Sequence, residues 1–166
     1  KPEPKKLEAA FTTSAHLNPN PSGQASPVRV RLYELKSFRT FEQADFVSLD
    51  EKDQETLGAD LLEREKLLFQ PNEARHYSRQ LRPETRYIGI VAAYRDIDNA
   101  VWRAIIEVKP HGTTHIVVRL DAKAVSMQLV EKDGISQNQP MPSQPDLKTN
   151  VEEASKIYQK YPGLPE

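Results

Sequence analysis

Short runs in which apolar and polar residues alternate dominate the middle of the chain. In one such run, Val28, Val30 and Leu32 fall on one face. Arg29 and Arg31 fall on the other face, which we expect to be exposed to water. A period of two residues is typical of a β-strand that buries one face. Several runs of this kind, separated by short polar turns, predict a β-sandwich or β-barrel.

Further runs predict the remaining strands. The run at 87–94 is apolar on both faces, as in a central strand that is covered on both sides. We expect a strand pair at about residues 62–69 and 74–81, joined by a turn at 71–73. We also expect Trp102, a large side chain inside an alternating run, to anchor the core. The inward residues of the other runs are Leu7, Ala9, Phe11 and Thr13; Ala104, Ile106 and Val108; Ile116, Val118 and Leu120, with Arg119 and Asp121 outward; and Val125, Met127 and Leu129.

One segment, at about residues 38–58, has helical rather than strand character. Thr40-Phe-Glu-Gln43 has the pattern of a capping box, which predicts a helix over about residues 40–49. Asp50 can cap a second helix at Glu51–Leu57, and Gly58 can end it by adopting a positive φ. We expect the phenylalanines of this segment to pack on the sheet. The predicted fold is therefore mainly β, with a short helical insertion between its second and third strands.

The prolines separate a folded body from the C-terminal part of the chain. Only three of the 13 prolines lie within residues 28–139. The hydrophobic fraction is 37%, which fits a normal core diluted by polar segments. We expect a single domain over residues 1–139, with an N-terminal arm at 1–6, followed by a proline-rich tail at 140–166.

Charge and motif content argue against several classes of function. The 23 Lys and Arg balance the 24 Asp and Glu, whereas a nucleic-acid binder needs a basic excess. The sequence has no cysteine, and therefore no disulfide or thiolate metal site. It has no nucleophile elbow, phosphate-binding glycine loop or His-Glu-x-x-His motif, and His111 and His115 flank a predicted turn. We expect no catalytic residue, metal site, cofactor or small-molecule substrate.

A long polar loop between the first two strands is the candidate binding site. Its length exceeds the 2–5 residues of a hairpin loop, and its prolines reduce the entropy lost on binding. We expect Leu17 and the prolines to offer apolar contacts, and the amides to bond with a partner. We expect the loop to contribute little to folding. It consists of His16, Leu17, Asn18, Pro19, Asn20, Pro21, Ser22, Gly23, Gln24, Ala25, Ser26 and Pro27.

A set of short strings occurs in a fixed order over about residues 7–130. The most specific is Tyr87-Ile-Gly-Ile-Val-Ala-Ala-Tyr-Arg-Asp96, followed by Val101-Trp102-Arg103. The others are Leu17-Asn18-Pro19, Ser26-Pro27-Val28-Arg29-Val30, Tyr33-Glu34-Leu35-Lys36-Ser37, Phe41 with Ala44-Asp45-Phe46-Val47-Ser48-Leu49, Leu57-Gly58-Ala59-Asp60-Leu61-Leu62, and Pro71-Asn72-Glu73. Taken together, the ordered set resembles the outer-membrane lipoproteins of the bacterial type VI secretion system, the TssJ, SciN or VasD family.

The resemblance implies a transthyretin-like two-sheet β-sandwich without enzyme activity, on the periplasmic side of the outer membrane. It implies that the loop at 16–27 binds the periplasmic C-terminal domain of the large inner-membrane component, TssM, and that the isolated protein is a monomer. It also implies a lipid-bearing cysteine, which we expect shortly ahead of Lys1. The alternative function is a periplasmic carrier of small ligands in the same sandwich. A carrier would need a cavity lined by small inward residues, for which Gly89, Ala92 and Ala93 are the candidates.

Overall fold

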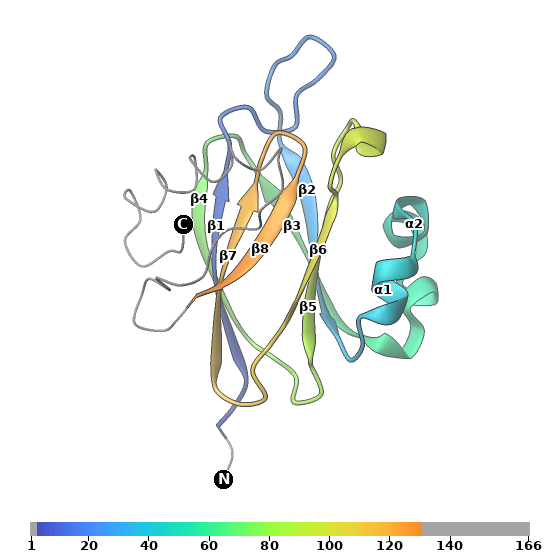
Figure 1. Ribbon diagram of the computed structural model, residues 1–166, viewed down its shortest axis with the longest axis vertical. Helices are drawn as coiled ribbons and strands as arrows, with labels where there is room; N and C mark the ends of the chain where they lie inside the picture. Colours follow the sequence, from blue (N-terminus) through green and yellow to red (C-terminus); the bar gives the residue numbers. More distant parts are fainter. Residues whose placement is uncertain (1–2, 131–166) are drawn as a thin grey trace.

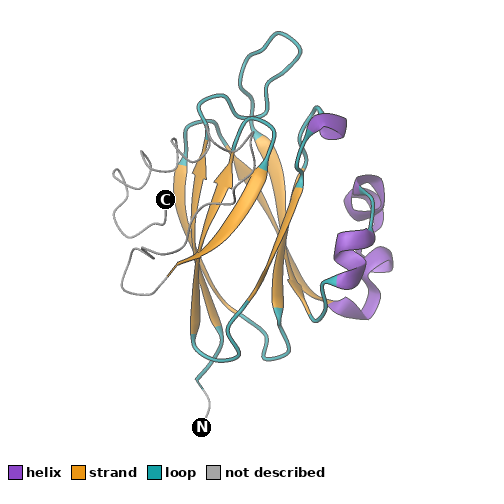
Figure 2. Ribbon diagram, viewed as in Figure 1, coloured by secondary structure: helices purple, strands orange, loops and turns teal. Residues whose placement is uncertain are grey.

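Two four-stranded sheets pack face to face in the computed structural model, which describes residues 3–130 (Figures 1 and 2). One sheet has the strand order β4-β1-β7-β8 and the other β3-β2-β5-β6. Neighbouring strands are antiparallel except β1 and β7, which run parallel. The strands are β1 (Lys6–Thr13), β2 (Val28–Leu35), β3 (Leu61–Phe69), β4 (Ala74–Gln80), β5 (Tyr87–Ala92), β6 (Arg103–Glu107), β7 (Thr113–Leu120) and β8 (Val125–Val130).

The alternation of the sequence correctly indicates which faces meet between the sheets. Phe11 stacks on Phe69 with ring centroids 4.6 Å apart, and Tyr77 packs against Phe11 edge-on. Val28, Val30 and Leu32 join the same cluster, as do the predicted inward residues of β1, β7 and β8 other than Thr13. The mainly β, two-sheet prediction is confirmed. The expected domain end at residue 139 and the tail at 140–166 lie outside the described residues.

The prediction that strands 62–69 and 74–81 pair with each other is wrong. β3 pairs with β2 in one sheet, whereas β4 pairs with β1 in the other. The turn between them crosses the edge of the sandwich, with Asn72 at a φ of 58°. Phe69 of β3 and Tyr77 of β4 nevertheless contact the same core cluster, each from its own sheet.

The predicted helical insert is present, but its helices begin and end elsewhere. They are α1 (Arg39–Gln43), α2 (Phe46–Leu57) and the 3-10 turn η1 (Gly58–Asp60), and they lie on the outer face of the β3-β2-β5-β6 sheet (Figure 2). The expected capping box does not form. Instead, Asp45 caps α2 by accepting the N–H of Ser48 at 2.7 Å. Asp50 pairs with Arg31 rather than capping a helix, and Gly58 ends α2 at a φ of 55°, as predicted.

Arg31 is not exposed to water as its place in the alternation predicts. It is 7% exposed and lies beneath α2, where it donates to the carbonyl oxygen of Leu49 at 2.8 Å. It also pairs with Asp50 at 2.9 Å. Beside it, the hydroxyl of Tyr33 donates to Asp53 at 3.0 Å. The polar residues on this face of β2 therefore attach the helical insert to the sheet.

Three other placements differ from the prediction. Trp102 precedes β6 and is half-buried: it contacts both hydrophobic clusters, and its ring meets Phe46 edge-on. It therefore joins the insert to the sandwich rather than anchoring the middle of the core. Arg119 and Asp121, expected outward in water, are buried and pair at 2.6 Å.

Candidate functional site

The connections at one end of the sandwich lie together (Figure 1). They are the segments 14–27, 70–73, 93–102 and 121–124, and 14–27 projects farthest beyond the strands. Backbone hydrogen bonds join them: Asn72 donates to Ser14 at 3.1 Å and Asn18 donates to Ala122 at 2.9 Å. This end is therefore a continuous surface built from both sheets.

The base of the loop is part of the fold, contrary to the expectation that the loop contributes little to folding. Leu17 is fully buried in the main hydrophobic cluster, so it offers no apolar contact at the tip. Asn18 and Ser26 are 4% and 8% exposed. The signal in the sequence is that Leu17 is the single large aliphatic residue in a stretch of proline and small polar residues. Because no alternating pattern of apolar residues surrounds Leu17, the sequence does not indicate whether its side chain is buried or exposed.

Asn18 fixes the direction in which the loop leaves the sandwich. Its φ is 46°, a conformation that asparagine adopts more readily than most residues. Its side-chain oxygen accepts the backbone N–H of Arg95 at 2.8 Å, and its amide donates to the carbonyl of Pro27 at 2.8 Å. Ser26 donates to the backbone oxygen of Asn18 and accepts from the guanidinium of Arg95 at 3.1 Å. The two ends of the loop are thereby tied to each other and to the segment after β5.

The tip of the loop, residues 19–24, is an ordered turn organised by Asn20. The side-chain oxygen of Asn20 accepts the N–H groups of Ser22 and Gln24, each at 2.9 Å. Its backbone N–H donates to Gln24 and its carbonyl accepts from Gly23, each at 2.8 Å. Gly23 has a positive φ of 84°, a region that favours glycine. The turn is therefore held by local hydrogen bonds.

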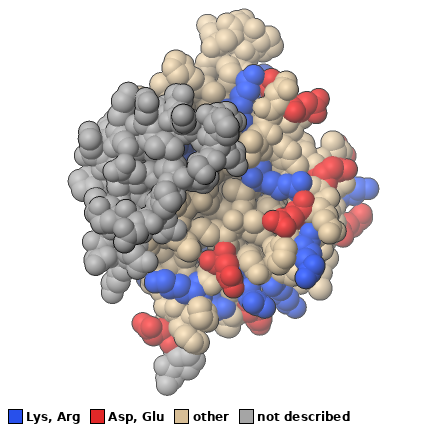
Figure 3. All heavy atoms as spheres, viewed as in Figure 1, with Lys and Arg blue, Asp and Glu red and all other residues tan. Residues whose placement is uncertain are grey.

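The tip is exposed and carries no charge. The residues at 21–25 are all exposed, and the loop at 16–27 contains no Lys, Arg, Asp or Glu. Figure 3 shows the projecting end of the molecule without charged side chains, above a surface where both signs are mixed. Of the predicted site residues, the structure exposes His16, Pro21, Ser22, Gly23, Gln24, Ala25 and Pro27, half-buries Pro19 and Asn20, and buries Leu17, Asn18 and Ser26.

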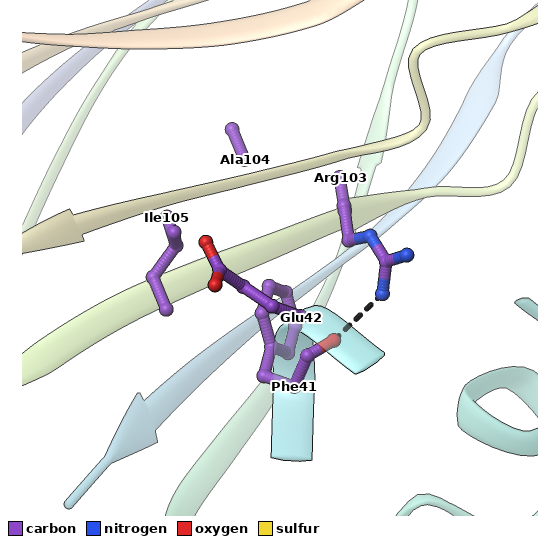
Figure 4. A pocket seen from close by; sticks show the side chains of 5 residues that line it. All are labelled: Phe41, Glu42, Arg103, Ala104 and Ile105. Carbon is purple, nitrogen blue, oxygen red and sulfur yellow. Dashed lines mark hydrogen bonds between the residues drawn. The ribbon is translucent and has the colours of Figure 1, made fainter. Parts of the chain in front are cut away.

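A second candidate surface lies between the helical insert and β6 (Figure 4). It is an open hollow lined by Phe41, Glu42, Arg103, Ala104 and Ile105. The guanidinium of Arg103 donates to the carbonyls of Phe41 at 2.7 Å and Ala44 at 2.6 Å. These two bonds satisfy carbonyl groups at the end of α1. Through these bonds Arg103 attaches α1 to the sheet, which gives the hollow a structural role.

The ionisable side chains of the described residues do not converge on a chemical centre. Among residues 3–130, no group of three or more His, Cys, Asp or Glu side chains comes together as metal ligands. His76 contacts Glu8 at 2.5 Å, and Ser78 contacts the same carboxylate oxygen at 2.5 Å.

The described helices include none that is long and apolar enough to cross a bilayer.

Solved structures of type VI secretion lipoproteins share this fold. A crystal structure of the lipoprotein TssJ1 from Pseudomonas aeruginosa matches with 40% sequence identity and a TM-score of 0.74, over 77% of this chain and 98% of that chain. The structure of Lip from Serratia marcescens, a membrane-bound component of the type VI secretion system, matches with 22% identity and a TM-score of 0.68. That match covers 78% of this chain and 99% of that chain.

A third similar structure is described as the C-terminal domain (869–1107) of the type VI secretion protein TssM from EAEC. It has 22% identity and a TM-score of 0.59, over 75% of this chain and 99% of the matched chain. Among curated protein sequences, none matches this chain. The family model described as type VI secretion lipoprotein (VasD, EvfM, TssJ) matches residues 5–123. The chain therefore belongs to the family of type VI secretion lipoproteins.

Proposed function

We propose that this chain is a non-enzymatic structural lipoprotein of the type VI secretion membrane complex. In this role a lipid group ahead of Lys1 holds it at the outer membrane, on the periplasmic side. The loop at 16–27 binds the periplasmic C-terminal domain of TssM, so that the chain links the two. The observation that carries the proposal is the ordered, uncharged tip at residues 19–24, which projects beyond every strand (Figure 1).

The direction of β1 suits a link between a membrane and a partner. β1 leads from the N-terminal end of the sandwich directly into the loop at the opposite end (Figure 1). All of its residues are in extended conformation, so the strand separates its two ends by nearly the greatest distance that the chain allows. An anchor that precedes the strand and a binding loop that follows it would therefore lie on opposite sides of the domain. The sandwich would act as a rigid spacer between them.

The similarity to the structure described as the TssM domain also supports the proposal. The match covers 75% of this chain and 99% of the matched chain, so the matched chain is shorter than this one. The TssM span 869–1107 named in the description is about twice as long as that matched chain. A small lipoprotein that was solved together with the TssM domain would give this match.

The proposal is tested by calorimetric titration of this chain with the C-terminal periplasmic domain of TssM from the same secretion system. We expect saturable binding. Val47→Ser, at a residue 59% exposed on α2, is the matched control for the helical insert, and it should bind as the parent does. If the parent chain shows no binding, the proposed function is wrong. If Val47→Ser alone loses affinity, the insert rather than the loop makes the contact.

A further inference from the structure

We infer that the backbone of the loop tip, residues 19–24, offers only hydrogen-bond acceptors, and that its binding partner must supply the donors. This inference rests on the proposed function and specifies the chemistry of the surface that receives the tip. It replaces the expectation that the amides of the loop bond with a partner.

Every backbone donor of the tip is absent or already used. Pro19 and Pro21 have no N–H. The N–H groups of Ser22 and Gln24 donate to the side chain of Asn20, and that of Gly23 donates to its carbonyl. The N–H of Asn20 itself donates to the carbonyl of Gln24. Just beyond the tip, Ala25 retains the one backbone N–H in 19–27 that bonds to nothing within the described chain.

The carbonyl groups of the same residues remain available. Within residues 3–130, no donor reaches the backbone oxygens of Pro19, Pro21, Ser22 or Gly23. The hydroxyl of Ser22 is also exposed, has no bonded neighbour in that part of the chain, and can donate as well as accept. Each carbonyl oxygen has two lone pairs, so the turn presents a compact set of acceptors without a compensating charge.

This asymmetry limits the way in which a partner can bind. A strand that adds to a sheet edge needs donors and acceptors in alternation, which the tip does not have. The acceptors instead suit a concave site lined by backbone N–H groups or by Arg and Lys side chains. Burying these carbonyls without donors would cost free energy, so the donors also discriminate between correct and incorrect partners.

Substitutions at Ser22 test whether the partner surface that receives the tip favours a negative or a positive charge there. Ser22→Glu, Ser22→Gln and Ser22→Lys leave the backbone unchanged at an exposed position and differ in charge. In titrations against the C-terminal domain of TssM, we expect Ser22→Glu to bind within threefold of Ser22→Gln or more tightly. We expect Ser22→Lys to bind at least tenfold more weakly than Ser22→Gln, and the difference to shrink as salt is added. Equal or tighter binding by Ser22→Lys would overturn the inference.

Amide hydrogen exchange on the free chain tests the turn without any partner. The amides of Ser22, Gly23 and Gln24 should exchange more slowly than that of Ala25. Asn20→Ala should abolish the protection of Ser22 and Gln24, whose N–H groups donate to the Asn20 side chain. Asn20→Asp, which keeps the accepting oxygen, should retain it. Fast exchange at these amides in the parent would contradict a preformed acceptor surface, whether or not TssM binds.

Discussion

The side chain of Asn18 accepts the backbone N–H of Arg95 at 2.8 Å, although the two residues are 77 positions apart. The contact joins the binding loop to the segment that follows β5. Because Asn18 is almost fully buried, its hydrogen bonds have no competition from solvent. The loop therefore has two parts with different roles: a base that belongs to the core and a tip that projects from it.

Asn18→Ala should destabilise the protein by about 2–4 kcal/mol. The change leaves the N–H of Arg95 and the carbonyl of Pro27 without their partner at a part-buried site, and it places alanine at a positive φ. Urea unfolding measures the loss. Asn18→Gly removes the same hydrogen bonds without the backbone strain and should lose less. If both variants unfold at the parent's midpoint, the base of the loop is not structural.

Replacement of residues 20–24 by Gly-Ser should change stability by no more than about 1 kcal/mol. The hydrogen bonds of the tip are internal to it, and the entropy of closing a loop varies slowly with its length. A deletion that also includes Asn18 or Ser26 should cost considerably more, because it removes buried contacts. Thermal melts of the two variants separate these cases. Equal melting temperatures would show that the base and the tip of the loop contribute equally to stability.

Gly89→Ala should destabilise the protein by about 1–3 kcal/mol through overpacking. A Cβ at Gly89 would lie 2.9 Å from the ring of Phe41 and 3.1 Å from Leu35. The double variant Gly89→Ala/Phe41→Leu should be more stable than the sum of the two single losses predicts, since the smaller side chain makes room. Strict additivity in urea unfolding would show that Phe41 does not pack on Gly89.

Stability should fall in acid partly through Asp53. Burial alone would raise the pKa of Asp53, but hydrogen bonds from Arg64 and Tyr33, with the charges of Arg64 and Arg31, outweigh it. The pKa therefore lies below its ordinary value of 3.8. A lowered pKa gives stabilisation that is complete above the ordinary value and is lost as the pH falls through the lowered one.

Asp53→Asn tests this account. At pH 7 it should cost about 3 kcal/mol, because it leaves Arg64 without its buried partner. The difference between parent and variant should stay constant from pH 7 to about 4 and narrow as the pH falls further, through the lowered pKa of Asp53. Denaturant unfolding at several pH values measures it, and a difference that does not vary with pH would contradict a role for the charge of Asp53.

Periodicity in the sequence is sufficient to predict the strands and the position of the helical insert, since both depend on local alternation. It is insufficient where distant segments meet. Arg31 occupies a water-facing position in its strand, but α2 returns over it eighteen residues later. β3 and β4 are neighbours in sequence but belong to different sheets, and Phe69 and Tyr77 reach Phe11 from the two sides of the core.

The candidate loop was predictable from its length and its prolines, but the division between base and tip was not. That division depends on Leu17 in the core and on the bond from Arg95 to Asn18, and both involve residues far away in sequence. The order within the tip depends on one asparagine that accepts two N–H groups. Such a motif is recognisable once the backbone is known, but it is too short to distinguish from other polar turns in the sequence.

The measurement that tests the central claim most directly is a titration of the TssM C-terminal domain with the chain whose residues 20–24 are replaced by Gly-Ser. The variant should melt as the parent does, so any loss of affinity reports on the contact and not on folding. We expect binding to weaken at least tenfold, which is about 1.4 kcal/mol. If the Gly-Ser variant binds TssM as tightly as the parent, the account is contradicted and the contact lies on another surface.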